Sequence, residues 1–371
     1  MKTQKNNFCA TLVILFIIGS SACAYYNVID LGTLGGYPWS SALSINNKGQ
    51  IVGEVGGYGP EEYACLFDPT GGGANKGLGD GSARSINDNA AGQIVGWTFN
   101  SSGLPCACLF DPTGGGDNRN LGTLGGNESC ANSINNSGQI VGRARISPFS
   151  AHACLFDSMG GGANIDLGTL GGEWSSAQSI NNNGQIVGDA RNSHDRAHAC
   201  LFDPTGGGNN IDLGTLGGEW SWAQSINNKG QIVGEADDSS GYERACLFDP
   251  TGNGNNINLG TLGGYNCSIA WCINDNGQIV GETHIMYSGE QYRACLFDTT
   301  GQGNNIDLNS LIDPASGWTL KMASCINNNG WIVGYGINPA GYTHAYLLIP
   351  EPATLCLLGL GGLVLRRRHR A

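Results

Sequence analysis

Charged residues and proline are scarce in this chain of 371 residues. Only 13% of the residues are Asp, Glu, Lys or Arg, and 12 are proline, whereas a typical globular domain is about 25% charged. Glycine is abundant instead, with 61 copies. That argues against a mostly helical protein, because an interior Gly costs a helix about 1 kcal/mol relative to Ala. Collagen is excluded because the glycines do not recur at every third residue.

Catalytic motifs are also missing. The sequence has no Gly-x-Ser-x-Gly, no His-Glu-x-x-His and no glycine-rich phosphate loop with a lysine. Most Gly-Gly-Gly tracts follow Asp-Pro-Thr, which is typical of turns. We therefore expect a protein that is not an enzyme. An apolar content of 40% is enough for a folded core, so general disorder is not expected.

The first 24 residues have the pattern of a secretory signal peptide. Lys2 and Lys5 precede an apolar stretch over residues 8–18, and small residues at 22–24 form the cleavage site. A lipoprotein signal ending at Cys23 is less favoured, because Ser20 stands where Leu is usual. The mature chain would begin at Tyr25.

The last 22 residues, 350–371, form a second terminal signal. Thirteen apolar residues, 353–365, are too few to span a bilayer comfortably, which takes about 20. A weak tail anchor or a segment lying on the membrane surface is one interpretation. The motif residues, in order, are Pro350, Glu351 and Pro352, followed after the apolar stretch by Arg366, Arg367 and Arg368.

This arrangement resembles the PEP-CTERM sorting signal of Gram-negative bacteria, which has a Pro-Glu-Pro motif, a short apolar helix and a basic tail. The resemblance implies transient membrane association through the C-terminal segment and processing by an exosortase-type enzyme. It also implies delivery to the cell surface or extracellular matrix.

The chain between the two signals is acidic. Without the two lysines of the first signal and the four arginines and one glutamate of the second, 12 basic and 29 acidic residues remain, a net charge of −17. Such a body repels nucleic acid, whose phosphates require clusters of Lys and Arg. It fits an exported protein, or one that attracts divalent cations.

Residues 25–349 contain seven copies of one unit of about 46 residues. Each copy carries Ala-x-Ser-Ile-Asn or a close variant, a short turn, and Gln-Ile-Val-Gly. The isoleucines of the first motif are Ile45, Ile86, Ile134, Ile180, Ile226, Ile273 and Ile326. A second signature, Ala-Cys-Leu-Phe-Asp, and a third, Asp-Leu-Gly-Thr-Leu-Gly-Gly, recur in most copies.

Each unit is predicted to form four short strands, which in the first copy are residues 27–31, 42–46, 50–54 and 63–68. In the fourth strand Cys154 and Phe156 face one way and Ala153 and Leu155 the other. Both faces are apolar, so we expect this strand to be buried on both sides. Four strands per unit predict an all-β protein, a seven-bladed β-propeller in which residues 26–31 pair with residues 342–349 to close the ring. A β-solenoid is the alternative.

The repeat signatures resemble the HAF family of extracellular bacterial repeats, named for a His-Ala-Phe motif. His152-Ala153, His198-Ala199 and His344-Ala345 match its first two residues, whereas the third is Cys in most copies and Tyr346 in the last. The resemblance implies an exported repeat protein and no particular catalytic residues.

The 14 cysteines fall into groups with different expected roles. Six occupy one repeated strand position and are predicted to be small buried hydrophobic residues, because equivalent points on neighbouring blades lie beyond the roughly 7 Å reach of a disulfide. The better disulfide candidates are the irregular ones, Cys106, Cys130, Cys267, Cys272 and Cys325. The sequence does not define their pairing.

Several polar positions have residue types that can bind metal ions, but their pattern favours a structural role. His152, His198 and His344 recur at a strand position that elsewhere holds Tyr, Cys or Arg, which favours a tolerant strand end. The hairpin 179–186 resembles the start of a calcium loop, but its oxygens are mostly amides and Ala190 stands at the twelfth place. We therefore expect no metal or cofactor, with calcium the one ion left open.

Four acidic residues follow Gln-Ile-Val-Gly directly, in four of the copies. A cluster of acids there would hold a cation, but solvated strand ends are the favoured interpretation. The four residues are Glu54, Asp189, Glu235 and Glu282.

Four tryptophans follow the Gly-Gly pairs, where propellers often expose loops. Such side chains can stack on sugar rings, although packing between blades is the simpler interpretation. The four candidates are Trp39, Trp174, Trp220 and Trp222.

The expected function is a non-enzymatic binding or structural module at the cell surface, whose partners are extracellular polysaccharide or surface proteins. An enzyme that acts on extracellular polysaccharide through the propeller channel is the alternative.

Overall fold

The all-β class predicted from the sequence is confirmed. The computed structural model describes residues 26–57, 62–286 and 291–351. The helical elements in these ranges are two short 3-10 turns, η1 (Leu308–Leu311) and η2 (Pro314–Ser316). No helix of the described part is long and apolar enough to cross a membrane. The N-terminal signal, residues 1–24, lies outside the described residues.

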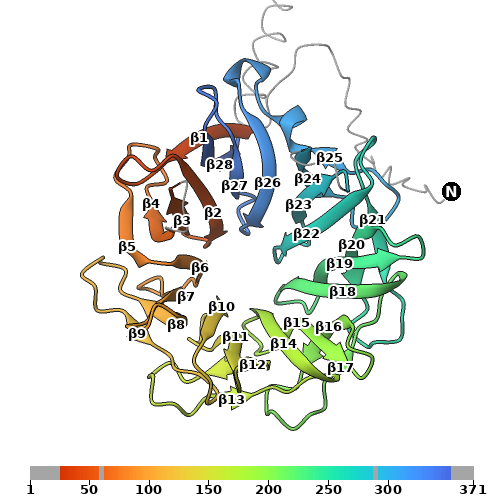
Figure 1. Ribbon diagram of the computed structural model, residues 1–371. Helices are drawn as coiled ribbons and strands as arrows, with labels where there is room; N and C mark the ends of the chain where they lie inside the picture. The colour runs from red at the N-terminus through yellow and green to blue at the C-terminus, as the bar shows by residue number, and fades with distance from the viewer. Residues whose placement is uncertain (1–25, 58–61, 287–290, 352–371) are drawn as a thin grey trace, which may run out of the picture.

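The strands form antiparallel sheets arranged as a ring (Figure 1). In each sheet, the strand closest to the centre of the ring ends within the Ser-Ile-Asn or Cys-Ile-Asn signature. These innermost strands are β2 (Trp39–Ile45), β6 (Ser82–Ile86), β10 (Ser129–Ile134), β14 (Gly171–Ile180), β18 (Gly217–Ile226), β22 (Cys267–Ile273) and β26 (Thr319–Ile326).

The second strand of each sheet begins within Gln-Ile-Val-Gly, or within Trp-Ile-Val-Gly in the last copy, and the third contains Ala-Cys-Leu-Phe or its last variant. The second strands are β3 (Ile51–Gly56), β7 (Ile94–Phe99), β11 (Ile140–Arg145), β15 (Ile186–Asn192), β19 (Ile232–Asp238), β23 (Ile279–His284) and β27 (Ile332–Ile337). The third strands are β4 (Glu62–Phe67), β8 (Pro105–Phe110), β12 (Ala151–Phe156), β16 (Ala197–Phe202), β20 (Glu243–Phe248), β24 (Tyr292–Phe297) and β28 (Thr343–Pro350).

The outermost strands are short, except for the one that the N-terminus supplies. They are β5 (Lys76–Asp80), β9 (Arg119–Asn120), β13 (Ile165–Asp166), β17 (Ile211–Asp212), β21 (Ile257–Gly260), β25 (Ile306–Asp307) and β1 (Tyr26–Gly32). Strand β1 pairs antiparallel with β28, so the first described strand completes the last sheet. The sheets of β10–β13 and β14–β17 are joined by a single parallel bridge between Ala151 and Trp174. Within each sheet the strands run antiparallel, unlike the stacked coils of a β-solenoid.

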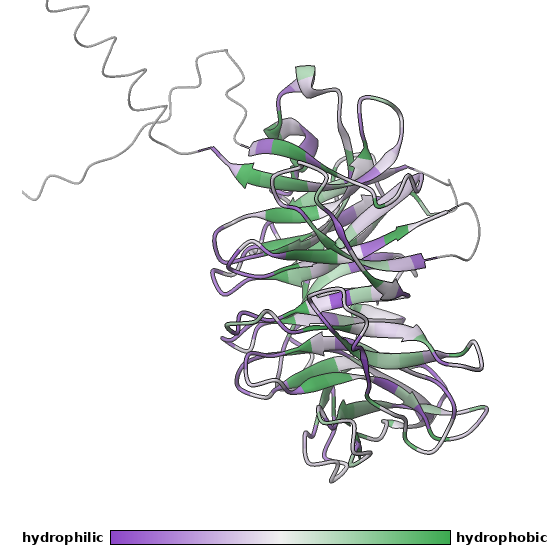
Figure 2. Cartoon of the chain, turned by 90° about the vertical axis from the view of Figure 1, so that its left-hand side faces the viewer, coloured by the Kyte–Doolittle hydropathy of each residue, from purple (hydrophilic) through white to green (hydrophobic). Residues whose placement is uncertain are grey.

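The core lies between neighbouring sheets. One typical cluster joins Val141 and Ala153 of one sheet to Ile180, Ile186 and Cys200 of the next. The strands with Ala-Cys-Leu-Phe, fourth in the predicted unit and third in the observed sheets, are buried on both faces as expected. Ala153 of β12 belongs to this cluster, whereas Cys154 and Phe156 of β12 belong to the cluster shared with the preceding sheet. Figure 2 shows most of the hydrophobic residues along the strands. The six regularly spaced cysteines are buried in this core: Cys65, Cys108, Cys154, Cys200, Cys246 and Cys295.

The glycine of Ile-Val-Gly is required by a close approach of two strands. Each innermost strand has a register shift opposite this glycine, such as the one between Ala177 and Ser179. A Cβ atom on Gly188 would lie well inside contact distance of the Ser176 carbonyl oxygen. A side chain at this position would therefore force the two strands apart.

The asparagine of each Ile-Asn motif links its sheet to the next one. Asn181 Oδ1 accepts hydrogen bonds from the backbone N–H groups of Asn183 and Gln185, both at 3.0 Å. Its Nδ2 donates to the carbonyl oxygen of Asn227 in the next sheet at 2.9 Å. This link repeats from Asn46 through Asn87, Asn135, Asn181, Asn227, Asn274 and Asn327 and returns to Asn46. We call this closed series the inner asparagine circuit.

A second closed series runs beside the first. In it the backbone N–H of the residue after each asparagine donates to the side-chain oxygen of its equivalent in the next sheet. Its members are Asn47, Asp88, Asn136, Asn182, Asn228, Asp275 and Asn328, and the last donates to the first. Because both series close, every neighbouring pair of sheets is held in the same register.

Replacing Asn181 by Ala should lower the free energy of unfolding by about 3 kcal/mol, because a buried group left without a partner costs about 1–3 kcal/mol. The residue is 4% exposed. Its loss takes one of two donors from the Asn227 carbonyl, which keeps the Gly230 N–H, and removes the acceptor of two backbone N–H groups in its own turn. Denaturant unfolding followed by circular dichroism measures the change. Ser137→Ala, in the equivalent turn of the preceding sheet, is the control, since this exposed side chain should change stability by less than about 0.5 kcal/mol. Equal stability of the two variants would contradict the role of the circuit.

Candidate functional site: an arginine–tryptophan cleft

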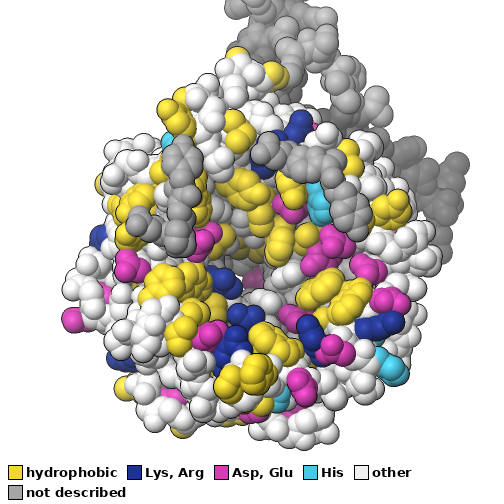
Figure 3. Space-filling model, in the orientation of Figure 1, with side chains coloured by type: hydrophobic (Ala, Val, Ile, Leu, Met, Phe, Trp, Pro, Cys, Tyr) yellow, Lys and Arg dark blue, Asp and Glu magenta, His cyan; other side chains and the backbone are white. Residues whose placement is uncertain are grey.

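A cleft of about 210 Å³ lies on the face shown in Figure 3, where basic and hydrophobic side chains gather near the central depression. It is formed by three successive sheets, those of β6–β8, β10–β12 and β14. Its walls include three arginines and two tryptophans: Arg84, Arg143, Arg145, Trp97 and Trp174. Three of the 12 basic residues of the acidic body therefore line one cleft.

Trp174 is the centre of the cleft. The guanidinium carbon of Arg143 lies 5.5 Å from the centroid of its ring, and that of Arg145 lies 5.7 Å away. Both distances are typical of cation–π contacts. The indole Nε1 donates a hydrogen bond to the Phe149 carbonyl at 3.1 Å, which fixes the plane of the ring.

The arginines are oriented by neighbouring polar groups. Arg145 Nε donates to Glu128 Oε2 at 2.9 Å and Arg145 Nη1 to the Pro148 carbonyl at 2.7 Å. Arg84 Nη1 donates to Asn132 Oδ1 at 2.9 Å. A fixed guanidinium presents its remaining N–H groups in a planar fork that matches a carboxylate. The cleft can therefore bind an acidic group through its guanidinium N–H groups, beside the indole rings of Trp97 and Trp174 that line it.

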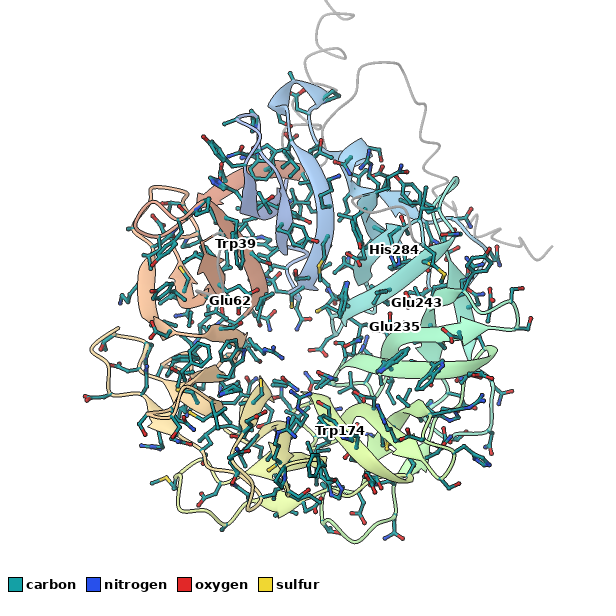
Figure 4. The ribbon with its side chains drawn as sticks, in the orientation of Figure 1. Trp39, Glu62, Trp174, Glu235, Glu243 and His284 are labelled. Carbon is teal, nitrogen blue, oxygen red and sulfur yellow. The ribbon has the colours of Figure 1, made fainter. Side chains whose placement is uncertain are left out.

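The four tryptophans singled out from the sequence do not meet in one site. All four are half-buried. Trp39 lies on the other side of the ring from Trp174 (Figure 4) and donates from Nε1 to the Gly57 carbonyl at 2.9 Å. Trp220 and Trp222 stack on each other, with centroids 6.2 Å apart and planes 7° from parallel.

Sequence reasoning missed most of the cleft. Trp97 and Arg143 stand at the position after Ile-Val-Gly, where four other copies have an acid. Two neighbouring copies thus exchange an acid for an aromatic or a basic residue, and this local change of charge was the available signal. Arg84 adds a third charge from the innermost strand β6.

Two of the four acids after Ile-Val-Gly are buried and the other two, Glu54 and Asp189, are half-buried, so the expectation of solvated strand ends is wrong. Glu235 and Glu282 are 8% and 5% exposed, because the second strand lies within the sheet and its neighbours cover it. Burial raises the pKa of Asp189 to about 6, that of Glu282 to about 7 and that of Glu235 to about 8. The charges of Glu243 and Glu282 add to the effect at Glu235, whose Oε2 has no hydrogen-bond partner among the residues that the structure describes.

The axial cavity, of about 290 Å³, is lined by side chains of mixed character. Each copy contributes the residue between the Ala and the Ser or Cys of its first motif, and these are Leu43, Arg84, Asn132, Gln178, Gln224, Trp271 and Ser324. Of the four acids after Ile-Val-Gly, Glu54 lines this cavity. Neither a set of converging acids nor a wall of small apolar residues is found there.

Glu243, Cys267 and His284 form a group that could hold a metal ion. One ligand atom from each lies within 4.8 Å of the others, and carboxylate, thiolate and imidazole are all ligands of zinc. His284 Nε2 lies 3.5 Å from Glu243 Oε2, and its Nδ1 lies 4.0 Å from Glu282 Oε1. Figure 4 shows Glu243 and His284 of this group beside Glu235. No sequence motif indicates this group, because the three residues come from different strands of two sheets.

The three repeated histidines do not converge. His152 Nδ1 contacts Asp166 at 2.9 Å, and His198 Nδ1 contacts Asp212 at 2.8 Å. His344 contacts Asp30 of β1 at 2.8 Å. Each histidine thus links the third strand of its sheet to the outermost strand of the same sheet.

The C-terminal sorting signal is confirmed. The model of the PEP-CTERM protein-sorting motif matches residues 348–370. Within this range Pro350 ends β28 and pairs with Tyr26, and Glu351 is exposed, whereas Pro352 and the arginines Arg366, Arg367 and Arg368 lie outside the described residues. The motif marks a protein that is exported through the membrane to the cell surface or beyond.

The other comparisons say little about activity. No curated protein matches the chain. Among solved structures, a gluconolactonase of Xanthomonas campestris is similar with a TM-score of 0.42 and 12% identity over 79% of this chain and 91% of that one. A likeness this weak carries no argument about the function of this chain.

Glu235 should make stability depend on pH. Its pKa in the folded protein, about 8, lies above the ordinary value of 4.5, so the folded state holds the proton more tightly than the unfolded state does. Stability is therefore lost as the pH rises from about 4.5 to about 8. Glu235→Gln removes this loss, so at pH 8 the variant should be more stable than the parent by about 4 kcal/mol and at pH 4 about equal to it.

Urea unfolding at a series of pH values measures this difference. Glu173→Gln, at an exposed position of β14, should follow the parent at every pH. A constant difference between Glu235→Gln and the parent across the range would contradict the raised pKa.

Proposed function

We propose that this protein is an exported, non-enzymatic binding module of the cell surface or extracellular matrix, sorted by an exosortase-type enzyme in a Gram-negative bacterium. We further propose that its domain is a seven-bladed β-propeller of the HAF repeat type. The propeller assignment is supported by the seven signature copies and by the hydrogen-bond series that return to their first members. The sorting motif at residues 348–370 supports the route of export.

The ligand that best fits the arginine–tryptophan cleft is an acidic polysaccharide. The observation that carries this proposal is the pair of guanidinium groups held over Trp174. An indole face stacks on the apolar face of a sugar ring, and an oriented guanidinium binds the carboxylate of a uronic acid. Elsewhere the acidic body repels such a polymer, which favours binding at this one basic place.

Binding without catalysis is supported by the distribution of the acids. In sugar hydrolysis two carboxyl groups flank the scissile bond, separated by about 5–10 Å. The arginine–tryptophan cleft has one carboxylate, Glu128, and this side chain is paired with Arg145. Of the acids whose pKa burial raises to about 6–8, Glu235 and Glu282 belong to other sheets, and Asp189 lies on β15 beside β14. None of the three is among the residues that line the cleft.

Binding is tested by calorimetry with the full chain, using short oligogalacturonates and matched neutral oligosaccharides, with and without calcium. Trp174→Ala and Arg143→Gln should each raise the dissociation constant for the acidic sugar about tenfold, which corresponds to the loss of about 1.4 kcal/mol from a desolvated cation–π and stacking contact. Added salt should weaken the binding of the acidic sugar further. Trp220→Ala is the control, because this half-buried tryptophan lies outside the cleft. If the cleft variants bind as tightly as the parent, the cleft is not the binding site.

The enzyme alternative has a separate test. Incubation of the full chain with the same oligosaccharides should give no shorter products, as followed by mass spectrometry. Glu235→Gln serves as the matched variant, because its parent carboxyl has a pKa near neutrality, as a general acid requires. Cleavage by the parent that is lost in Glu235→Gln would overturn the non-enzymatic assignment while leaving the binding measurement intact.

A further inference from the structure

The residue before Ile-Asn is Ser in five of the seven copies and Cys in two neighbouring ones. The serines have a common structural role. The backbone N–H of Ile226, for example, donates to Ser179 Oγ at 3.3 Å, and that of Ile273 donates in the same way to Ser225 Oγ. The hydroxyls of Ser85, Ser133, Ser179 and Ser225 thus each tie their innermost strand to the innermost strand of the next sheet.

The two cysteines, Cys272 on β22 and Cys325 on β26, occupy this position in adjacent sheets. Their Sγ atoms are 3.1 Å apart. A disulfide requires about 2.05 Å, so the sulfurs have to move together by about 1 Å. Equivalent positions can come this close on the innermost strands because the sheets converge toward the centre of the ring (Figure 1).

Hydrogen bonding alone does not explain the paired replacement. A thiol is a weaker donor and acceptor than a hydroxyl, so each cysteine weakens the link between two sheets. Ile326 N–H donates to Cys272 Sγ at 3.4 Å, a contact that a serine would make more strongly. A covalent bond between the two sulfurs would hold the two sheets together more strongly than the hydrogen bonds that the serines would make.

The junction between these two sheets is also the least regular in the ring. Equivalent residues are 53 positions apart here, against 41 to 48 at the other junctions along the chain. The added length contains η1 and η2, which replace the usual Gly-Thr-Leu-Gly-Gly connection. On its outer side the sheet of β26–β28 is completed only by pairing with β1.

We propose that Cys272 and Cys325 form a disulfide that joins the closing sheet to its neighbour at the inner edge of the ring. The oxidant is a disulfide of an exported thiol oxidoreductase or a small-molecule disulfide. One cysteine thiolate attacks a sulfur of the oxidant, forms a mixed disulfide and releases one thiol. The other thiolate then attacks the cysteine sulfur of the mixed disulfide and releases the second thiol. Two cysteines are oxidised, one oxidant disulfide is reduced, and the protons of the two cysteine thiols end on the released thiols.

The surroundings allow this reaction. Both cysteines are half-buried and line the cavity of about 180 Å³ beside the inner asparagine circuit. The contact between the two sulfurs stabilises the first thiolate to form, because the other thiol donates a hydrogen bond to it. Export supplies the oxidising compartment in which disulfides persist. The proposal does not depend on which ligand the protein binds.

The test uses the full chain, equilibrated with reduced and oxidised glutathione and then alkylated after denaturation. Non-reducing peptide mapping by mass spectrometry should find Cys272 linked to Cys325. The double variant Cys272→Ser with Cys325→Ser restores the residue of the other five copies and should fold normally. The oxidised parent should have the same number of alkylated cysteines as this variant and two fewer than the reduced parent.

Reduction should lower the melting temperature of the parent by about 5–10 °C, because the disulfide closes a loop of more than 50 residues. It should leave the double variant unchanged. Cys106→Ser, on β8 of a distant sheet, is the control and should keep both the linked peptide and the shift. Alkylation of both cysteines in the oxidised parent, or a link from either one to a different cysteine, would overturn the proposal.

Discussion

The inner asparagine circuit is the interaction on which the rest of the structure depends. One buried amide in each copy closes its own hairpin and donates to the next sheet, and the last donates to the first. A buried amide is costly unless its donors and acceptor are satisfied. Here they are satisfied only when each sheet is placed relative to the next one in the same way around the ring. The ring is therefore specified at its narrowest point, and the loops farther out can vary.

The distance from the centre of the ring decides what each repeated position can do. Near the centre equivalent residues almost touch, so asparagines bond to one another and two cysteine sulfurs lie 3.1 Å apart. Farther out, the third-strand cysteines are separated by the core between sheets, and each packs as a small apolar side chain. One rule for all the cysteines would be wrong, since sheets that radiate from a centre diverge as they extend outward.

Much of the fold could be predicted from the sequence, because a repeated pattern of strands and turns is local information. The burial of Ala153 and Cys154 on opposite faces and the pairing of β1 with β28 followed from it. The cleft could not be predicted, because its residues come from three copies and stand at positions where the pattern varies. Glu235 and Glu282 were misjudged for a related reason: position along a strand does not reveal which neighbouring strand covers it.

The sequence by itself determined the repeat, the class of fold, the turns that the glycines allow and the terminal sorting signal, because each depends on residues close together in the chain. Only the tertiary structure decided which variable residues meet. It placed Trp174 against two arginines, gathered Glu243, Cys267 and His284, and brought Cys272 to Cys325. The reason is physical: a ring of sheets makes neighbours of residues some 40 to 50 positions apart, and their distance depends on how the sheets pack.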